Sequence, residues 1–178
     1  MRIAYIAFLR GINVGGHGVV KMAELRNAFE AMGFASVRTL LASGNVIFET
    51  ERKDRKALTR EIESRLAAFK KDIRVVLRGL EDIRALQESD PFKGIKVTPS
   101  VRLYVTFLSE KAESPAITIP YATPQKEFRI LRASRTEVFS VLDLSKGKGT
   151  PDVMNVLEKE FGSNNTTRNW NTVLKALA

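Results

Sequence analysis

The spacing of apolar residues in the first half of the chain predicts alternating strands and helices. Residues 3–9 (IAYIAFL) are apolar throughout, which is typical of a strand that is covered on both faces. A period near 3.6 then predicts helices around residues 22–32 and 58–69. Further strands are expected at 37–42, 46–50 and 72–78, the first two joined by a turn at Ser43-Gly44-Asn45. The order βαββαβ is that of the ferredoxin-like fold.

The second half repeats this order imperfectly. Alternation predicts strands at 101–108, 127–132 and 137–142, whereas residues 111–124 hold three prolines and are expected to be irregular. A helix is expected from Thr150-Pro151 to 161, with Thr150 as its N-cap. A last helix is expected over about 168–177, capped by Thr166 or Thr167, and no closing strand is evident.

These patterns predict an α+β protein of two ferredoxin-like halves packed together, of which the second is degenerate. The second half would cover the face of strand 3–9 that the helices leave open. Residues 89–100 contain two prolines and a glycine and are the best candidate linker. We therefore expect an N-terminal subdomain at 1–90 and a C-terminal subdomain at 91–178 with an extra C-terminal helix.

Composition excludes several kinds of chemistry. The 178 residues include no Cys and one His, which excludes disulfides, thiolate metal cages, a cysteine nucleophile and a multi-histidine site. We predict no metal and no cofactor, because no Asp, Glu and His grouping has ligand spacing. No run is long enough to span a bilayer and no signal peptide is evident, so a soluble, cytoplasmic protein without a membrane partner is expected.

The charge favours anionic partners but does not identify one. Lys and Arg number 29 against 20 Asp and Glu, a net charge of +9. The excess is divided between both halves, and the densest basic stretch, residues 52–71, is interleaved with acids as on a solvated helix face. Phosphate contact is the commonest use of a basic surface.

A glycine-rich loop at residues 10–21 is the first candidate site. Its glycines allow close approach of the backbone to a ligand, and Arg10, Asn13 and Lys21 add polar groups beside a helix start. The spacing matches neither phosphate-loop pattern, and a plain connection whose glycines satisfy turn geometry is the alternative. His17 has no Ser or Cys partner at a catalytic spacing.

Two further polar segments precede predicted helices. Lys146, Gly147, Lys148 and Thr150 form a candidate secondary anion site, for which a capped helix with a polar loop is the alternative. Residues 164–172 combine Arg168, Asn169 and Asn171 with the only Trp, Trp170, which serves either as a core anchor or as a stacking platform.

Several short motifs resemble one widespread bacterial family of proteins without an assigned function. They are residues 7–16 (AFLRGINVGG), 21–25 (KMAEL), 42–48 (ASGNVIF) and 166–173 (TTRNWNTV). The resemblance extends over the whole chain and implies two ferredoxin-like halves but no activity. The motif positions that would carry a role are Arg10, Asn13, Gly15, Gly16, Lys21, Ser43, Asn45, Thr167, Arg168, Asn169 and Asn171.

The favoured function is binding of a phosphate- or carboxylate-bearing small molecule or nucleotide, with no reaction or oligomeric state assigned. The ligand would occupy a cleft formed by the glycine-rich loop and the TTRNWN segment. Its predicted contacts are Arg10, Asn13, Gly15, Gly16, Lys21, Ser43, Asn45, Arg168, Asn169 and Asn171. An RNA-binding module is one alternative, although the third strand offers only Phe48 for stacking. An interaction domain without a ligand is the other.

Overall fold

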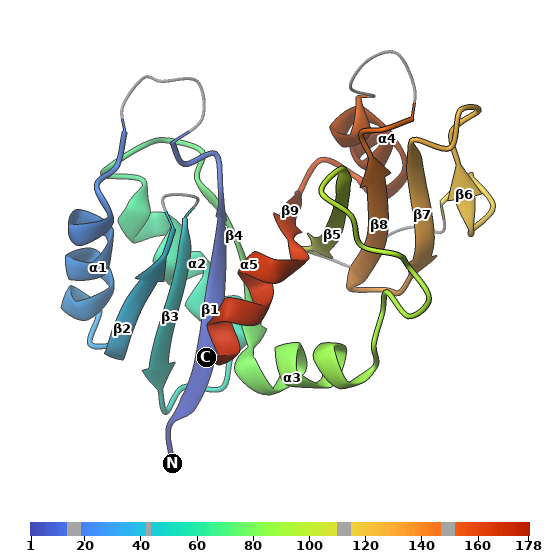
Figure 1. The fold of residues 1–178 in the computed structure, drawn as a ribbon. Helices are drawn as coiled ribbons and strands as arrows, with labels where there is room; N and C mark the ends of the chain where they lie inside the picture. Colours follow the sequence, from blue (N-terminus) through green and yellow to red (C-terminus); the bar gives the residue numbers. More distant parts are fainter. Residues whose placement is uncertain (14–18, 42–43, 110–114, 147–151) are drawn as a thin grey trace. The chain divides into compact units, whose positions relative to one another are not determined.

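The computed structural model describes residues 1–13, 19–41, 44–109, 115–146 and 152–178 of the chain. They form two compact units (Figure 1). Unit 1 comprises Met1–Leu86 together with Leu174–Ala178, and unit 2 comprises Gln87–Val173. The sequence placed the division after residue 90 and the whole C-terminus in the second half. The compact units divide after Leu86 instead, and the last five residues pack with unit 1.

Unit 1 has the predicted βαββαβ order. Its elements are β1 (Ile3–Arg10), α1 (Met22–Ala31), β2 (Ala35–Leu40), β3 (Asn45–Thr50), α2 (Arg55–Leu66) and β4 (Arg74–Gly79). The antiparallel sheet has the strand order β2-β3-β1-β4. Helix α3 (Leu80–Glu88) follows β4 without a break.

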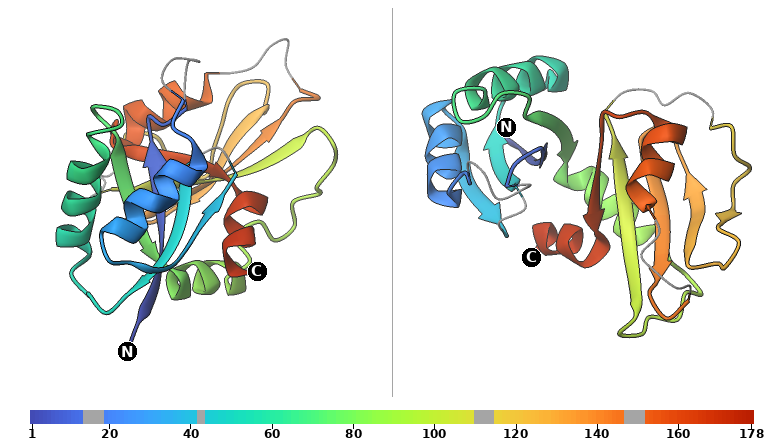
Figure 2. Two further views of the ribbon diagram at one scale, coloured as in Figure 1. Left: turned by 90° about the vertical axis from the view of Figure 1, so that its left-hand side faces the viewer. Right: turned by 90° about the horizontal axis from the view of Figure 1, so that it is seen from above.

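Helices α1 and α2 cover one face of the unit 1 sheet, as Figures 1 and 2 show. Tyr5, Ala7 and Leu9 of β1 point to this face and join the core with apolar residues of α1 and α2. The alternate residues Ile6 and Phe8 point to the opposite face and are also buried. Burial on both faces explains why β1 is apolar throughout. On the opposite face, Arg38 of β2 donates to the carbonyl oxygen of Ala176, at 2.8 Å.

Unit 2 repeats the strand order of unit 1 but is degenerate. Its elements are β5 (Val101–Leu108), β6 (Tyr121–Ala122), β7 (Phe128–Ala133), β8 (Glu137–Asp143), α4 (Val153–Phe161), β9 (Asn165–Asn169) and α5 (Trp170–Leu174), and its described residues form no helix between β5 and β7. The sheet order β6-β7-β8-β5-β9 contains the order of unit 1, with β5, β7, β8 and β9 in place of β1, β2, β3 and β4. Helix α4 covers one face through Leu157 and Phe161. The prediction of two ferredoxin-like halves is confirmed.

Strand β9 corrects the sequence-based expectation for residues 165–169. We expected Thr166 or Thr167 to cap a helix beginning near 168, whereas these residues form the closing strand of unit 2 and pair with β5. The Thr167 hydroxyl lies 2.8 Å from that of Thr106 across the strand pair. This contact satisfies polar groups at a buried position, so the polar sequence is compatible with a strand. The last helix therefore begins at Trp170, and a 3-10 turn (Lys175–Leu177) ends the chain.

Aspartates cap two of the helices. The Asp152 side chain accepts a hydrogen bond from the backbone N–H of Asn155 and caps α4, whereas Thr150, the N-cap expected from the sequence, lies outside the described residues. Asp54 accepts from the N–H of Ala57 at the start of α2. This bond is the main cause that lowers the pKa of Asp54 below its ordinary value of 3.8.

The Asp54 cap predicts a pH-dependent contribution to stability. Because the pKa is lower in the folded than in the unfolded state, the charged cap stabilises the fold above pH 3.8. That contribution is lost as the pH falls through the folded pKa. Asp54→Ala should lower Tm at pH 7 by about 2–4 °C, and this difference should shrink below pH 3.8. Thermal melts from pH 2 to 7 measure it, with Asp54→Asn as a control that keeps a cap without a titrating group. A loss that is constant across this range would contradict the prediction.

No helix among the described residues is both long and apolar enough to cross a membrane.

Candidate functional site

The described part of the glycine-rich loop lies at the end of the unit 1 sheet where β1 stops. Gly11 and Asn13 have φ values of +82° and +53°, so the chain turns sharply after Arg10. The Asn13 side chain then closes the base of the loop. Its Oδ1 accepts from the N–H of Val20 at 2.7 Å, and its Nδ2 donates to the carbonyl oxygen of Val20 at 3.1 Å. Lys21 follows at once, at the start of α1.

Gly44, just before β3, lies against Leu9 and Ile12 at the described start of this loop. The Gly44 carbonyl oxygen accepts from the N–H of Leu9, at 2.8 Å, and a Cβ on Gly44 would overlap the side chain of Ile12. Asn45 is buried, and its Nδ2 donates to the carbonyl oxygen of Leu40. The structure thus brings Arg10, Asn13, Lys21 and Asn45 to one end of the sheet. Asn13 and Asn45 hold turns there with their side-chain amides.

Arg74 joins this group although the sequence did not single it out. Arg10 on β1 is the cross-strand partner of Arg74 on β4, so both side chains lie on the same face of the sheet. Arg74 is exposed and makes no ion pair with a residue that the structure describes. Only the strand register reveals the pair, because 64 positions separate its members along the chain.

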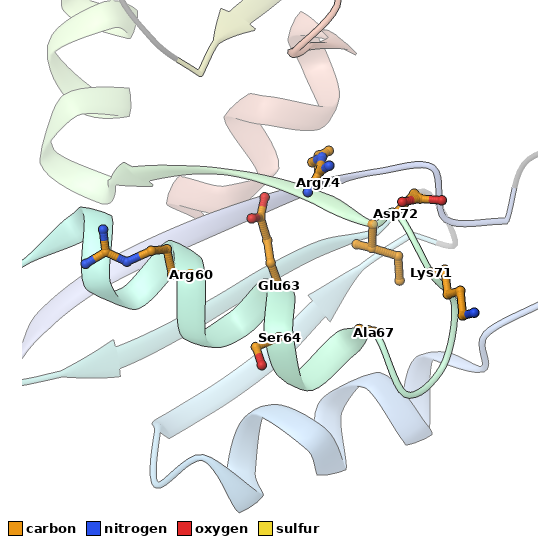
Figure 3. Close-up of a pocket in the computed structure, with 8 residues that line it drawn as sticks. Arg60, Glu63, Ser64, Ala67, Lys71, Asp72 and Arg74 are labelled. Atoms are coloured by element: carbon orange, nitrogen blue, oxygen red, sulfur yellow. The ribbon is translucent and has the colours of Figure 1, made fainter.

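A hollow of about 420 Å³ lies between α2 and the start of β4 (Figure 3). It is lined by Arg60, Glu63, Ser64, Ala67, Lys71, Asp72, Ile73 and Arg74. Figure 3 shows Arg60 and Lys71 extending in opposite directions. The Glu63 carboxylate accepts a hydrogen bond from the N–H of Val75 and so holds α2 to the edge strand. The charged groups of this hollow therefore do not converge on one point.

The predicted residues of the TTRNWN segment lie in unit 2. Arg168 is half-buried on β9, and its Nη1 donates to Thr166 Oγ1 and to the carbonyl oxygen of Thr167. Burial lowers the pKa of Arg168 to about 10, which leaves the guanidinium charged at neutral pH. Asn169 Oδ1 accepts from the N–H of Asn171, a capping contact at the start of α5.

Trp170 is buried in an aromatic cluster, as a core anchor would be. Its ring centroid lies 5.7 Å from that of Phe92 and 6.2 Å from that of Phe139. The indole is therefore packed inside unit 2 and is not an exposed platform.

The secondary anion site is described only at Lys146. Lys146 Nζ lies 3.9 Å from the carboxylate of Asp143, whose pKa is lowered mainly by the hydroxyl and N–H of Ser145. The other predicted residues, Gly15, Gly16, His17, Ser43, Gly147, Lys148 and Thr150, lie outside the described residues. Within the described ranges, no three Asp, Glu or His side chains gather as a metal site would require.

Comparison with known proteins agrees with the fold. No curated protein matches the sequence. A solved structure, that of a conserved bacterial protein from Streptococcus pneumoniae, is similar over 100% of both chains, with a TM-score of 0.65 and 19% identity. At this identity the likeness shows the fold alone.

The family resemblance is confirmed over most of the sequence. The family model covers residues 3–139, which include the glycine-rich loop and the β2–β3 turn but not residues 166–173. The chain belongs to the family described as proteins of unknown function, DUF1697.

Proposed function

We propose that the protein binds an anionic small molecule or nucleotide, bearing phosphate or carboxylate, at the end of the unit 1 sheet. The observation that carries this proposal is the Arg10–Arg74 pair on directly opposed positions of β1 and β4. Two guanidinium groups on neighbouring strands and on the same face of the sheet could together hold one phosphate or carboxylate group through charge-assisted hydrogen bonds. Such an arrangement favours an anionic ligand over a neutral one.

The surroundings of this pair support the same class of ligand. Lys21, at the N-terminus of α1, stays a predicted contact, and the helix dipole there also favours negative charge. The side-chain amides of Asn13 and Asn45 donate to the carbonyl oxygens of Val20 and Leu40 and so fix these described residues before a ligand arrives. Arg168, Asn169 and Asn171 stay predicted contacts of the ligand.

The burial of Phe48 counts further against the RNA-binding alternative. Phe48, the one aromatic residue that the third strand offered for base stacking, is fully buried in the core beneath α1 and α2. A base could not reach its ring without unfolding of the unit. We therefore rank a small anionic ligand above single-stranded RNA.

A thermal-shift screen of the whole chain tests the proposal. The panel contains inorganic phosphate, pyrophosphate, citrate, ATP and a short single-stranded RNA. A ligand at about 100 times its Kd should stabilise the protein by about 2.7 kcal/mol. Arg10→Ala and Arg74→Ala should each weaken binding roughly 10- to 100-fold, because each removes a charge-assisted contact.

Control variants separate the site from general charge effects. Arg65→Ala removes one exposed arginine from α2 and should leave the affinity unchanged. Arg168→Ala tests whether the predicted contact in unit 2 takes part. Binding of none of these compounds, or an equal loss in Arg65→Ala, would contradict the proposed site. Binding of RNA alone, steeply weakened by salt, would favour the alternative.

A further inference from the structure

The two units match residue by residue at their central strands. The register pairs Ile6 with Ile47 and Arg78 in unit 1, and Val105 with Phe139 and Arg168 in unit 2. Aligning these rows superimposes the β1 sequence YIAFL (5–9) on the β5 sequence YVTFL (104–108). The first strands of the two units are therefore similar in sequence as well as in their position in the sheet.

In each unit, the row of residues that are paired across the four strands has an arginine at both ends. Arg38 on β2 pairs with Ile47, and Arg132 on β7 pairs with Phe139, each just after an irregularity in its strand. At the other end of the rows, Arg78 and Arg168 each donate Nη1 to the carbonyl oxygen of the preceding residue at 3.0 Å. Both the positions and the hydrogen bonds are thus repeated.

The arginine on β2 or on β7 contacts a segment of its own unit that follows the fourth strand of the other repeat. Arg38 in unit 1 donates to the carbonyl oxygen of Ala176, in the segment Leu174–Ala178 that comes after β9. Arg132 in unit 2 donates to Ser89 Oγ at 3.2 Å, in the segment Gln87–Phe92 that comes after β4. We call residues 174–178 the C-terminal strap and residues 87–92 the central strap.

The central strap also contacts Phe139 on β8, which belongs to the same row of paired residues. The Phe92 ring lies edge-on to Phe139, with centroids 5.8 Å apart, and the Arg132 guanidinium lies 5.0 Å from the Phe139 centroid. The C-terminal strap buries Ala176 fully. Each strap is therefore packed on the unit that contains its arginine, although it follows the closing strand of the other unit.

We propose that Arg38 and Arg132 are a duplicated pair of latch residues, each fastening one exchanged strap to its unit, and that the two straps open independently. An arginine suits this role because its long side chain carries several N–H donors, which can reach a backbone carbonyl oxygen, as at Ala176, or a hydroxyl oxygen, as at Ser89. The same residue type at the same register position in both repeats is what a duplicated latch requires. The inference does not depend on the proposed ligand.

Hydrogen exchange on the whole protein tests the proposal. Arg38→Ala should make exchange in peptides covering 170–178 about tenfold faster and leave peptides covering 87–95 unchanged. Arg132→Ala should do the reverse. Carboxypeptidase should also trim the C-terminus of Arg38→Ala faster, because cleavage requires the C-terminal strap to leave its unit.

Control variants distinguish a latch from general support of the fold. Arg26→Ala removes an exposed α1 arginine and should change neither strap. Arg38→Lys keeps a donor at this position and should restore part of the protection. Unchanged exchange in both straps, or faster exchange throughout a unit in either Ala variant, would overturn the proposal. Faster exchange of both straps in a single variant would overturn their independence.

Discussion

Phe48→Ala is expected to destabilise unit 1 by about 3–5 kcal/mol, the largest effect of any single substitution that we propose. Phe48 has no exposed surface and lies at the centre of an aromatic cluster. Its ring stacks on Phe34 with centroids 4.3 Å apart and lies 5.4 Å from Phe29 and 5.8 Å from Tyr5. Truncation would leave a cavity among rigid rings that cannot close on it.

Urea denaturation can measure this loss and assign it to a unit. The only tryptophan, Trp170, is packed in unit 2, so its fluorescence follows that unit while far-UV circular dichroism follows both. Phe48→Ala should move the dichroism transition to a lower urea concentration. Phe69→Ala, which removes a ring that is 41% exposed, is the control and should change stability by about 0.5 kcal/mol or less. A Phe48→Ala loss below about 1 kcal/mol would contradict the predicted packing.

Gly44→Ala is the second large expected effect, at about 2–5 kcal/mol. Gly44 has a φ of +72°, a conformation that costs an alanine about 1 kcal/mol. The new Cβ would also overlap Ile12 Cγ2 and lie 3.1 Å from Leu9 Cβ, so the loop and the turn would have to move apart. The substitution tests the contact on which the candidate site is built.

Gly33 supplies a matched control for Gly44. Its φ of +80° is similar, but nothing lies within 4 Å of an added Cβ. Gly33→Ala should therefore cost only the conformational part, about 1 kcal/mol. The difference between the two losses of unfolding free energy measures the cost of the steric overlap. Adding Ile12→Ala to Gly44→Ala should recover part of that cost. Equal losses in Gly33→Ala and Gly44→Ala, by thermal or urea unfolding, would refute the close contact.

The fold was largely predictable because its strands and helices follow simple apolar patterns. The all-apolar sequence of β1 correctly indicated a strand buried on both faces. Strand β9 was missed because Asn, Thr and Arg fill it, and such residues also cap helices. Only the partner strand explains these residues, since the Thr167 hydroxyl meets that of Thr106. A single sequence does not reveal that partner.

The candidate site was harder to predict because polar side chains serve structure and binding alike. Asn13 and Asn45 stood out as ligand contacts, yet their amides hold the backbone of two turns. Arg74 was only one residue of the expected strand 72–78 and gained its interest through its register with Arg10. Sequence spacing identifies neighbours on one helix or strand but not across a sheet.

The packing of the C-terminal strap on unit 1 has a consequence for the folding of the protein during its synthesis. Domains generally fold during synthesis as units, beginning with the N-terminal one. Most of unit 1 is formed by Met1–Leu86, but Leu174–Ala178 also belong to it. A ribosome that has translated the first half has therefore not delivered all of unit 1. Unit 1 is completed only after translation has passed through all of unit 2 and reached Leu174–Ala178.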